Sequence, residues 1–251
     1  MAHHSFFSKS RINAIGAILL GWMVYTPYSG WKRGHDYHHR HSNNTDRKQY
    51  AQTAPLDIKQ YQKLSQAQKL MYKMIYGHWT LVSTTPYLYF MVYQRFISKW
   101  YENLLVAMYL LAIYGYGDYR LMMVDLLTTG LGGGLGVFLF HIQHTFEGSY
   151  KAPCSEYSRY ENGMTGSSYL LVPEWFKFFS ASIEYHHIHH LNTRVPLYNL
   201  RACHEFGQHL FNSVPTFTLL GAAQRLPYSI RVDENREFIS CYDDYFLSSA
   251  R

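Results

Sequence analysis

Apolar stretches of different lengths alternate with polar segments along this 251-residue chain. Leu121 to Phe140 reads LMMVDLLTTGLGGGLGVFLF, which has about the 20 residues that a helix needs to cross a hydrocarbon core. Trp79 to Ile97 reads WTLVSTTPYLYFMVYQRFI and is largely apolar, with Pro86 inside it and a charge only near its end. We therefore predict membrane-spanning segments near residues 79–97 and 121–140.

Within the segment 121–140, one charge and a run of glycines need an explanation. Asp125 must face protein or lie near a helix end, because a carboxylate that faces lipid is costly. Gly130 and Gly132 to Gly134 would let a second helix approach closely. We interpret the glycine run as a packing face rather than a phosphate-binding loop, because it lies in an apolar stretch.

Shorter patterns fill the rest of the chain. Ile12–Val24 is too short to span comfortably and is typical of an amphipathic or interfacial helix, and Leu104–Tyr116 is interfacial or buried. A polar loop over 54–73 leads into a helix, and a helix is expected from about Pro173 to Leu191. Asp233–Arg251 is polar and is expected to form a loosely packed cap.

These patterns predict one all-α domain over residues 1–251, a helical integral membrane protein with a helical cap on the cytosolic side. Aromatic residues make up 18% of the chain. Its 24 Tyr and 5 Trp suit an interface between an apolar phase and water, because each ring has an apolar body and a polar group. A mean hydropathy of −0.25 is instead typical of a soluble protein, so a soluble helical core remains the alternative.

Charge and cysteine content narrow the picture further. The net charge of +6 comes from thinly spread basic residues, which suit either a solvated face or contact with anionic lipid headgroups. No basic helix or nucleic-acid-binding motif accompanies them, so no nucleic-acid partner is expected. Cys154, Cys203 and Cys241 form no CxxC pair, which predicts free thiols in a reducing compartment.

Histidine spacing gives the strongest chemical indication. His35, His38 and His39 form one HxxHH pattern, and His186, His189 and His190 form another. On a helix, the spacing i, i+3, i+4 places three imidazoles on one face, where packing neutral imidazoles brings no hydrophobic gain. Imidazole is a common ligand of transition metals, so both triads predict metal ligation.

The number of histidines bears on the metal. Eight or so histidines without a thiolate suit two ions of the iron type better than one zinc, which takes four ligands. If the early and late clusters share one site, the chain must cross the membrane an even number of times between them. Crossings near 79–97 and 121–140 satisfy this condition, whereas adding Leu104–Tyr116 as a third would not.

Four sequence elements together resemble the histidine-box membrane fatty acid desaturases, closest to the bacterial and plastid-like acyl-lipid Δ12-like type. They are AHHSFF at 2–7, TPYSGWKRGHDYHH at 26–39 with Asn43 and Asp46, QHTFE at 143–147, and HHIHHLNTRVPLYNL at 186–200 with Cys203 and His204. The resemblance covers nearly the whole chain. The family's first box has a further His four residues before the position of His3, preceded by a membrane hairpin. Both are missing here, so the resemblance implies an N-terminally truncated chain.

The resemblance implies a ligand set for two iron ions. Carried over position by position, the eight ligands are His3, His35, His38, His39, His144, His186, His189 and His190. His4, His41, His187 and His204 lie beside the motifs and are expected to support the site or lie on the surface. His141 is close to His144 and is not counted as a ligand.

The implied activity is an oxygen-dependent desaturation that introduces a cis double bond into a membrane-associated acyl chain. The substrate would be a fatty acyl lipid, an acyl-CoA or an acyl carrier, and the electrons would come from a ferredoxin or a cytochrome b5-like donor. Pro86–Phe90 and Trp175–Phe179 either line the acyl path or pack as membrane anchors. The alternatives are another histidine-box oxygenase, such as a carotenoid ketolase or hydroxylase or an alkane hydroxylase, and an inactive metal-binding remnant.

Overall fold

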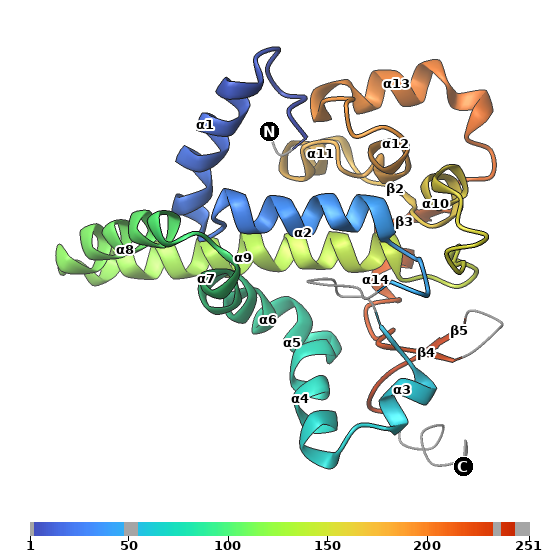
Figure 1. Cartoon of the computed structure of the whole chain (residues 1–251), viewed down its shortest axis with the longest axis horizontal. Coiled ribbons are helices and arrows are strands. Elements are labelled where there is room, and N and C mark those ends of the chain that lie inside the picture. Colours follow the sequence, from blue (N-terminus) through green and yellow to red (C-terminus); the bar gives the residue numbers. More distant parts are fainter. Residues whose placement is uncertain (1–2, 48–54, 233–236, 244–251) are drawn as a thin grey trace.

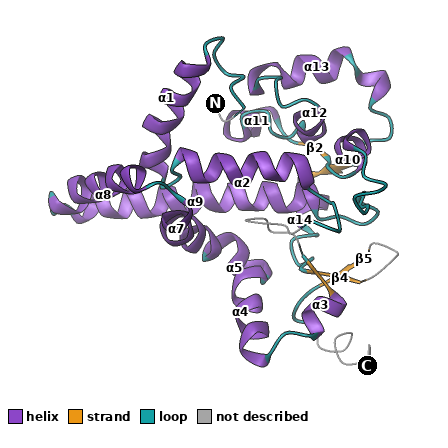
Figure 2. Ribbon diagram, viewed as in Figure 1, coloured by secondary structure: helices purple, strands orange, loops and turns teal. Residues whose placement is uncertain are grey.

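The computed structural model describes residues 3–47, 55–232 and 237–243, and its elements are mostly helical (Figure 1). The expected helical fold is therefore confirmed, although five short strands, β1 to β5, form two small sheets among the described residues (Figure 2). None of the strands exceeds three residues, too short to show the alternating pattern by which a strand is recognised in a sequence. Helix α9 (Tyr119–His144), the longest described helix, runs through the middle of the molecule.

Helices α8 (Trp100–Gly115) and α9 pack against each other and are joined by a tight turn. Gly117 adopts a φ of +80° in this turn, and the Asp118 side chain caps α9 by accepting from Arg120 N at 2.8 Å. One described helix, α9, is long and apolar enough to cross a membrane by length and composition. It contains the predicted segment 121–140.

Asp125 lies inside the protein, as expected for a carboxylate on an apolar helix. Its oxygens accept hydrogen bonds from Tyr109 Oη of α8 at 2.7 Å and from the hydroxyl of Tyr25. Tyr25 follows α1 (Ser10–Gly21) and the 3₁₀ turn η1 (Trp22–Val24). The carboxylate therefore ties the first helical segment to the α8–α9 pair.

The segment 79–97 is helical but is not one regular helix. It comprises most of α5 (His78–Ser83), then α6 (Thr85–Tyr87), a π-helical turn η2 (Leu88–Tyr93) and α7 (Gln94–Ile97). Pro86 has no N–H to donate, and the wider π turn follows it directly. A membrane-spanning role for this segment stays a prediction.

Three glycines of α9 lie in the expected packing face, whereas a Cβ at Gly132 would meet nothing within 4 Å. A Cβ at Gly134 would lie 2.5 Å from the carbonyl oxygen of Val82 in α5, and one at Gly133 would lie 3.0 Å from Pro86 and Phe90. A Cβ at Gly130 would collide with the Tyr87 ring. The missing side chains thus let α9 approach the backbone of the 79–97 segment.

Short helices and one small sheet cap the C-terminal end of α9. Strands β2 (Tyr169–Leu171) and β3 (Thr216–Thr218) pair in parallel, and α14 (Leu219–Ala223) follows β3. Leu139 and Ile142 of α9 pack there with Leu170, Phe176 and Ala222. The remaining elements of the cap are α10 (Arg159–Thr165), α11 (Glu174–Ser180), α12 (His186–Leu191), η3 (Leu197–Asn199), α13 (Leu200–Phe206) and η4 (Gln208–Leu210).

The continuous helix predicted from Pro173 to Leu191 is wrong. The chain leaves helical geometry at Ala181 and Ser182, which have positive φ angles of 50° and 64°. Two backbone carbonyls then make non-helical contacts: Ile183 O accepts from the Gln143 side chain at 2.8 Å, and Glu184 O accepts from Leu170 N at 3.1 Å. This break frees α12 to take a direction different from that of α11.

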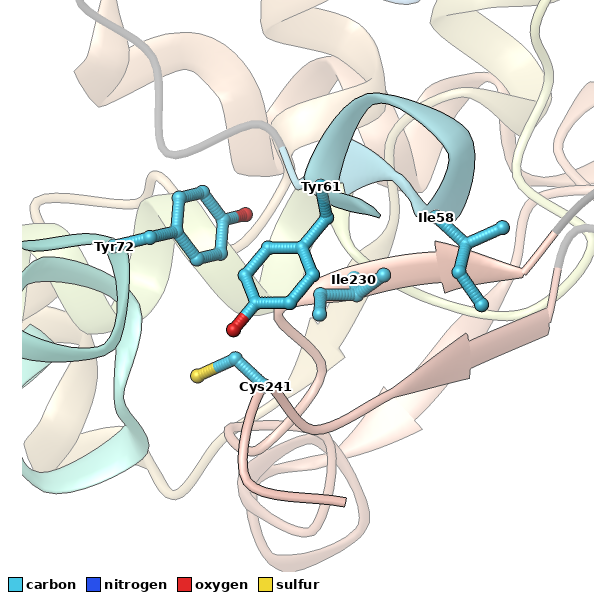
Figure 3. Close-up of a cluster of buried hydrophobic side chains, with 5 residues drawn as sticks. All are labelled: Ile58, Tyr61, Tyr72, Ile230 and Cys241. Atoms are coloured by element: carbon cyan, nitrogen blue, oxygen red, sulfur yellow. The ribbon is translucent and has the colours of Figure 1, made fainter. Parts of the chain in front are cut away.

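A second small unit brings residues 56–76 together with the C-terminal part of the chain. Strand β4 (Ile230–Val232) pairs with β1 (Leu56–Asp57) and with β5 (Glu237–Ile239), beside α3 (Ile58–Gln62) and α4 (Gln66–Tyr76). Its core contains Ile58, Tyr61, Tyr72, Ile230 and Cys241 (Figure 3).

The loosely packed tail predicted over 233–251 is therefore wrong for part of its length. Phe238 and Cys241 are buried, because β5 pairs with β4 and brings them into the protein. Residues 233–236 and 244–251 lie outside the described residues. All three cysteines are free thiols, as expected.

Candidate metal centre

The eight histidines expected as ligands come together in two groups of four. Cluster one contains His3, His35, His39 and His189, and cluster two contains His38, His144, His186 and His190. Within each cluster, one ring nitrogen from every histidine lies within 4.8 Å of the others.

Two helices share their histidines between the clusters in a crossed arrangement. Helix α2 (Tyr28–His41) gives the i, i+4 pair His35 and His39 to cluster one and His38 to cluster two. Helix α12 does the reverse, giving His186 and His190 to cluster two and His189 to cluster one. Because i and i+4 point in nearly the same direction and i+3 is offset, one HxxHH helix can serve two adjacent sites.

One histidine from elsewhere completes each cluster. His3, from the segment before α1, has its ring centre 4.8 Å from that of His35 and 4.6 Å from that of His39. His144, the last residue of α9, has its Nε2 3.2 Å from Nε2 of His38 and 2.9 Å from Nε2 of His186. In cluster one, Nε2 of His35 and Nε2 of His39 are 3.2 Å apart.

The two clusters adjoin each other. The ring centres of His39 and His190, which belong to different clusters, are 4.4 Å apart, and those of His38 and His39 are 5.4 Å apart. The arrangement is therefore one centre with two sets of nitrogen donors, as a dinuclear metal site requires.

The donor nitrogens fit metal binding better than mutual hydrogen bonding. In cluster two, Nε2 of His38 is 3.2 Å from both Nε2 of His144 and Nε2 of His190, yet a neutral ring nitrogen that donates has only one proton to give. Among the described residues, His3 Nε2 is also buried without a hydrogen-bond partner. Metal ions would use the converging lone pairs that hydrogen bonds cannot satisfy.

The surroundings keep these imidazoles neutral. Burial lowers the pKa of His3 to about 4 and the pKa of His189 to about 3. Burial, reinforced by repulsion from neighbouring histidines, also holds the pKa of His35, His186 and His190 well below the ordinary value. Neutral imidazole is the form that binds a metal, so the site is prepared for ligation near neutral pH.

Neighbouring groups fix the orientation of several rings. Trp31 stacks on His35 with ring centres 4.4 Å apart, and Phe140 lies 4.9 Å from His38. His144 Nδ1 lies 3.1 Å from the carbonyl oxygen of Gly166, to which it donates, so its Nε2 is left with a lone pair for cluster two. The sequence interpretation missed these supports. Trp31 and Phe140 each precede a cluster histidine by four residues, a spacing that could have revealed them.

The remaining histidines near the motifs lie outside the clusters. His4 is exposed, with its Nδ1 3.1 Å from Ser10 Oγ, and His41 packs against Tyr37. His187 Nε2 is 3.1 Å from His204 Nδ1. His141 is fully buried in α9 but belongs to neither cluster.

A cavity of about 570 Å³ adjoins the centre. His35 and His38 line it, so it touches both clusters. Most of its remaining wall is apolar or aromatic, formed by Trp31, Gly34, Ile75, Tyr76, Thr85, Leu88, Tyr89, Phe90, Tyr93, Gly136, Val137 and Phe140. The π-helical turn η2 contributes four of these side chains: Leu88, Tyr89, Phe90 and Tyr93. Residues 88–90 therefore line a cavity, which is compatible with the first of the two roles considered for residues 86–90, lining the acyl path.

Comparison with known proteins identifies the family. The family model described as fatty acid desaturase matches residues 1–217. The chain belongs to the fatty acid desaturase family. It is 30% identical over 251 residues to a fatty acid desaturase of Bacillus subtilis, an alignment that covers 95% of this chain and 70% of that protein.

Two cyanobacterial relatives match less closely. An sn-1 oleoyl-lipid 12-desaturase of Synechocystis is 25% identical over 227 residues, covering 80% of this chain and 60% of the relative. One of Picosynechococcus is 25% identical over 243 residues, covering 88% and 68% respectively. These matches confirm, at the level of the family, the resemblance drawn from the histidine motifs. Fatty acid desaturases are oxidoreductases.

Proposed function

We propose that this chain holds two iron ions in its paired histidine clusters and desaturates acyl chains at the expense of dioxygen. The observation that carries the proposal is the division of the eight family-matched histidines into two adjoining sets of four. Imidazole suits several transition metals, and membership of the fatty acid desaturase family supports iron among them. Each cluster would hold one iron.

The overall reaction balances with an external electron source. A saturated –CH₂–CH₂– unit, O₂, two electrons and two protons give a cis –CH=CH– unit and two waters. When bound, the irons supply the oxygen chemistry that removes two hydrogens from adjacent carbons. A ferredoxin or a cytochrome b5-like protein would supply the electrons.

The protein's own residues hold and shield the centre. The crossed donation from α2 and α12 fixes the two sites relative to each other, because each helix is bound to both. Trp31 stacks on the ring of His35 and Phe140 lies tilted against His38 at the cavity wall, where both would exclude water. Positioning of the acyl carbon then decides where the double bond forms.

The apolar cavity is the proposed acyl-chain site. Its volume falls within the usual range of ligand pockets, roughly 300–1,000 Å³, and its wall offers few polar groups. His35 and His38 bring the metal centre to this wall. A methylene segment lying along Leu88, Tyr89 and Phe90 would therefore lie beside the centre.

We also propose that α9 anchors the protein in a membrane with the metal centre on the cytosolic side. Leu127 and Leu131 on α9 are exposed, as are Met108 and Leu111 on α8, which suits lipid contact on the outer face of this helix pair. His144 ends α9, so a membrane-embedded α9 would place the centre at the interface. An acyl lipid could then reach the cavity from the bilayer.

Lipid analysis of a host strain tests the activity. The protein should be expressed in bacteria that make few unsaturated lipids, and the fatty acids should be analysed by gas chromatography with mass spectrometry. New monounsaturated or diunsaturated chains are expected with the wild type and none with His189→Ala. The matched control His209→Ala alters an exposed histidine outside both clusters and should leave the products unchanged. Hydroxylated chains without new double bonds would contradict the proposal.

A further inference from the structure

The Gly166 carbonyl oxygen lies at the centre of a partly buried hydrogen-bond network beside cluster two. It accepts from His144 Nδ1 at 3.1 Å and from the side-chain amide of Asn43, Nδ2, at 2.9 Å. A carbonyl oxygen has two lone pairs, and these two donors use both. The imidazole and the carboxamide are thus held by one shared acceptor.

The network continues to α2, another of the three helices that supply cluster two. Asn43 Nδ2 also donates to Asn162 Oδ1 at 2.8 Å, and Asn162 Nδ2 donates to Ser42 Oγ at 2.9 Å. Ser42 N in turn donates to the backbone carbonyl of His38 at 2.7 Å. The chain of contacts therefore runs from His144, at the end of α9, to His38 in α2.

The local backbone is shaped for this contact. Asn43 has a φ of 63°, a left-handed conformation that Asn adopts more readily than most residues, and its carbonyl accepts from Ala152 N at 3.2 Å. A Cβ at Gly166 would lie 2.6 Å from Asn162 Oδ1, 2.7 Å from the Asn162 carbonyl oxygen and 2.7 Å from Asn43 Nδ2, so only glycine leaves room for both asparagines. Both ends of the Asn43–Gly166 contact thus depend on their residue type.

We propose that Asn43 is a positioning residue for the metal centre, acting through the Gly166 carbonyl on His144. By fixing that carbonyl, Asn43 holds the His144 proton on Nδ1 and points Nε2 into cluster two. Groups that orient a ligating histidine in this way commonly change metal affinity or activity by roughly 10–100-fold when they are replaced. The inference rests on the proposed function, because it requires a metal in cluster two.

Three substitutions test the contact from both ends. Asn43→Asp keeps the shape and tolerates the left-handed backbone but cannot donate to Gly166, and Asn43→Gly keeps the backbone freedom and removes the amide. Gly166→Ala displaces the carboxamides of both Asn43 and Asn162 without changing either residue. The matched control is Asn212→Asp, which makes the same chemical change at an exposed asparagine.

The readout is the rate at which purified, iron-loaded protein loses metal to a chelator, followed with the Mössbauer spectrum. We expect one of the two irons to be lost roughly 10-fold faster in all three variants and its spectrum to change, while Asn212→Asp matches the wild type. Unchanged iron loss and spectra in the variants would overturn the inference alone.

Two further outcomes are decisive. If the metal-free variants melt at a lower temperature than the metal-free wild type and their iron loss rises only in proportion, the role is structural and the inference is overturned. A wild type that binds no metal would overturn the proposed function, and this inference with it.

Discussion

The contact between α9 and α5 predicts opposite effects for one substitution at two neighbouring glycines. A Cβ at Gly134 would lie 2.5 Å from the Val82 carbonyl oxygen, whereas ordinary contact begins at 3.4 Å, so the helices must separate by 0.9 Å (3.4 minus 2.5). A Cβ at Gly132 meets nothing within 4 Å. Gly134→Ala and Gly132→Ala are therefore a matched pair on one helix.

The expected sizes follow from two opposing terms. Alanine in place of glycine stabilises a helix interior by roughly 0.5–1 kcal/mol, and this applies at both positions. Forcing a methyl group into a packed contact costs about 1–3 kcal/mol, and this applies only at Gly134. We expect Gly132→Ala to gain up to about 1 kcal/mol and Gly134→Ala to lose up to about 2.5 kcal/mol net.

Thermal unfolding in detergent, followed by circular dichroism, measures the difference. For a domain of 150–250 residues, each kcal/mol changes Tm by about 2–4 °C, so the two variants should move in opposite directions from the wild type. Equal Tm values for both variants, or a higher Tm for Gly134→Ala than for Gly132→Ala, would refute the close α5–α9 contact.

Three further predictions concern other parts of the structure. Asp125→Leu removes the acceptor of the Tyr25 and Tyr109 hydroxyls and should cost about 1–3 kcal/mol for each hydroxyl left without a partner. The loss should shrink when both tyrosines are also changed to Phe, and additive losses in unfolding experiments would argue against the network. The free energy of unfolding of the metal-free protein should be highest above pH 6.5 and fall toward pH 4. Burial lowers the pKa of His3 to about 4, so on acidification His3 is protonated in the unfolded chain before it is protonated in the folded protein. A denaturant midpoint that rises on acidification over this window would contradict this sign. Gly136→Leu should fill part of the cavity and shift products toward shorter acyl chains without changing the iron content, and an unchanged product profile would remove Gly136 from the acyl path.

The two histidine triads were predictable from the sequence because their spacing is local, whereas His3 and His144 came from the family resemblance. His35, His38 and His39 show their shared helix face through spacing alone, and α12 repeats the pattern. Asp125 and the glycines of α9 were also interpretable, because a charge or a missing side chain on an apolar helix needs a partner. These features depend on single elements.

Features that depend on contacts between distant segments were not predictable. The break after α11 follows from the pairing of the Glu184 carbonyl with Leu170 and of the Ile183 carbonyl with Gln143, which no local pattern shows. Cys241 is buried because β5 pairs with β4, and the polar composition of the tail gives no indication of this pairing. The crossed assignment of the histidines depends on how α2 meets α12.

Two double variants test the crossed dinuclear centre most directly. His35→Ala with His39→Ala removes two donors from cluster one only, whereas His38→Ala with His39→Ala removes one donor from each cluster. Iron per chain is measured in purified protein by mass spectrometry of the metal, together with the Mössbauer spectrum.

We expect about two irons in the wild type and about one, with an unperturbed cluster-two spectrum, in the first double variant. The second double variant should disturb both irons. The same iron content and the same spectrum in the two double variants would contradict the division of the histidines into two sites.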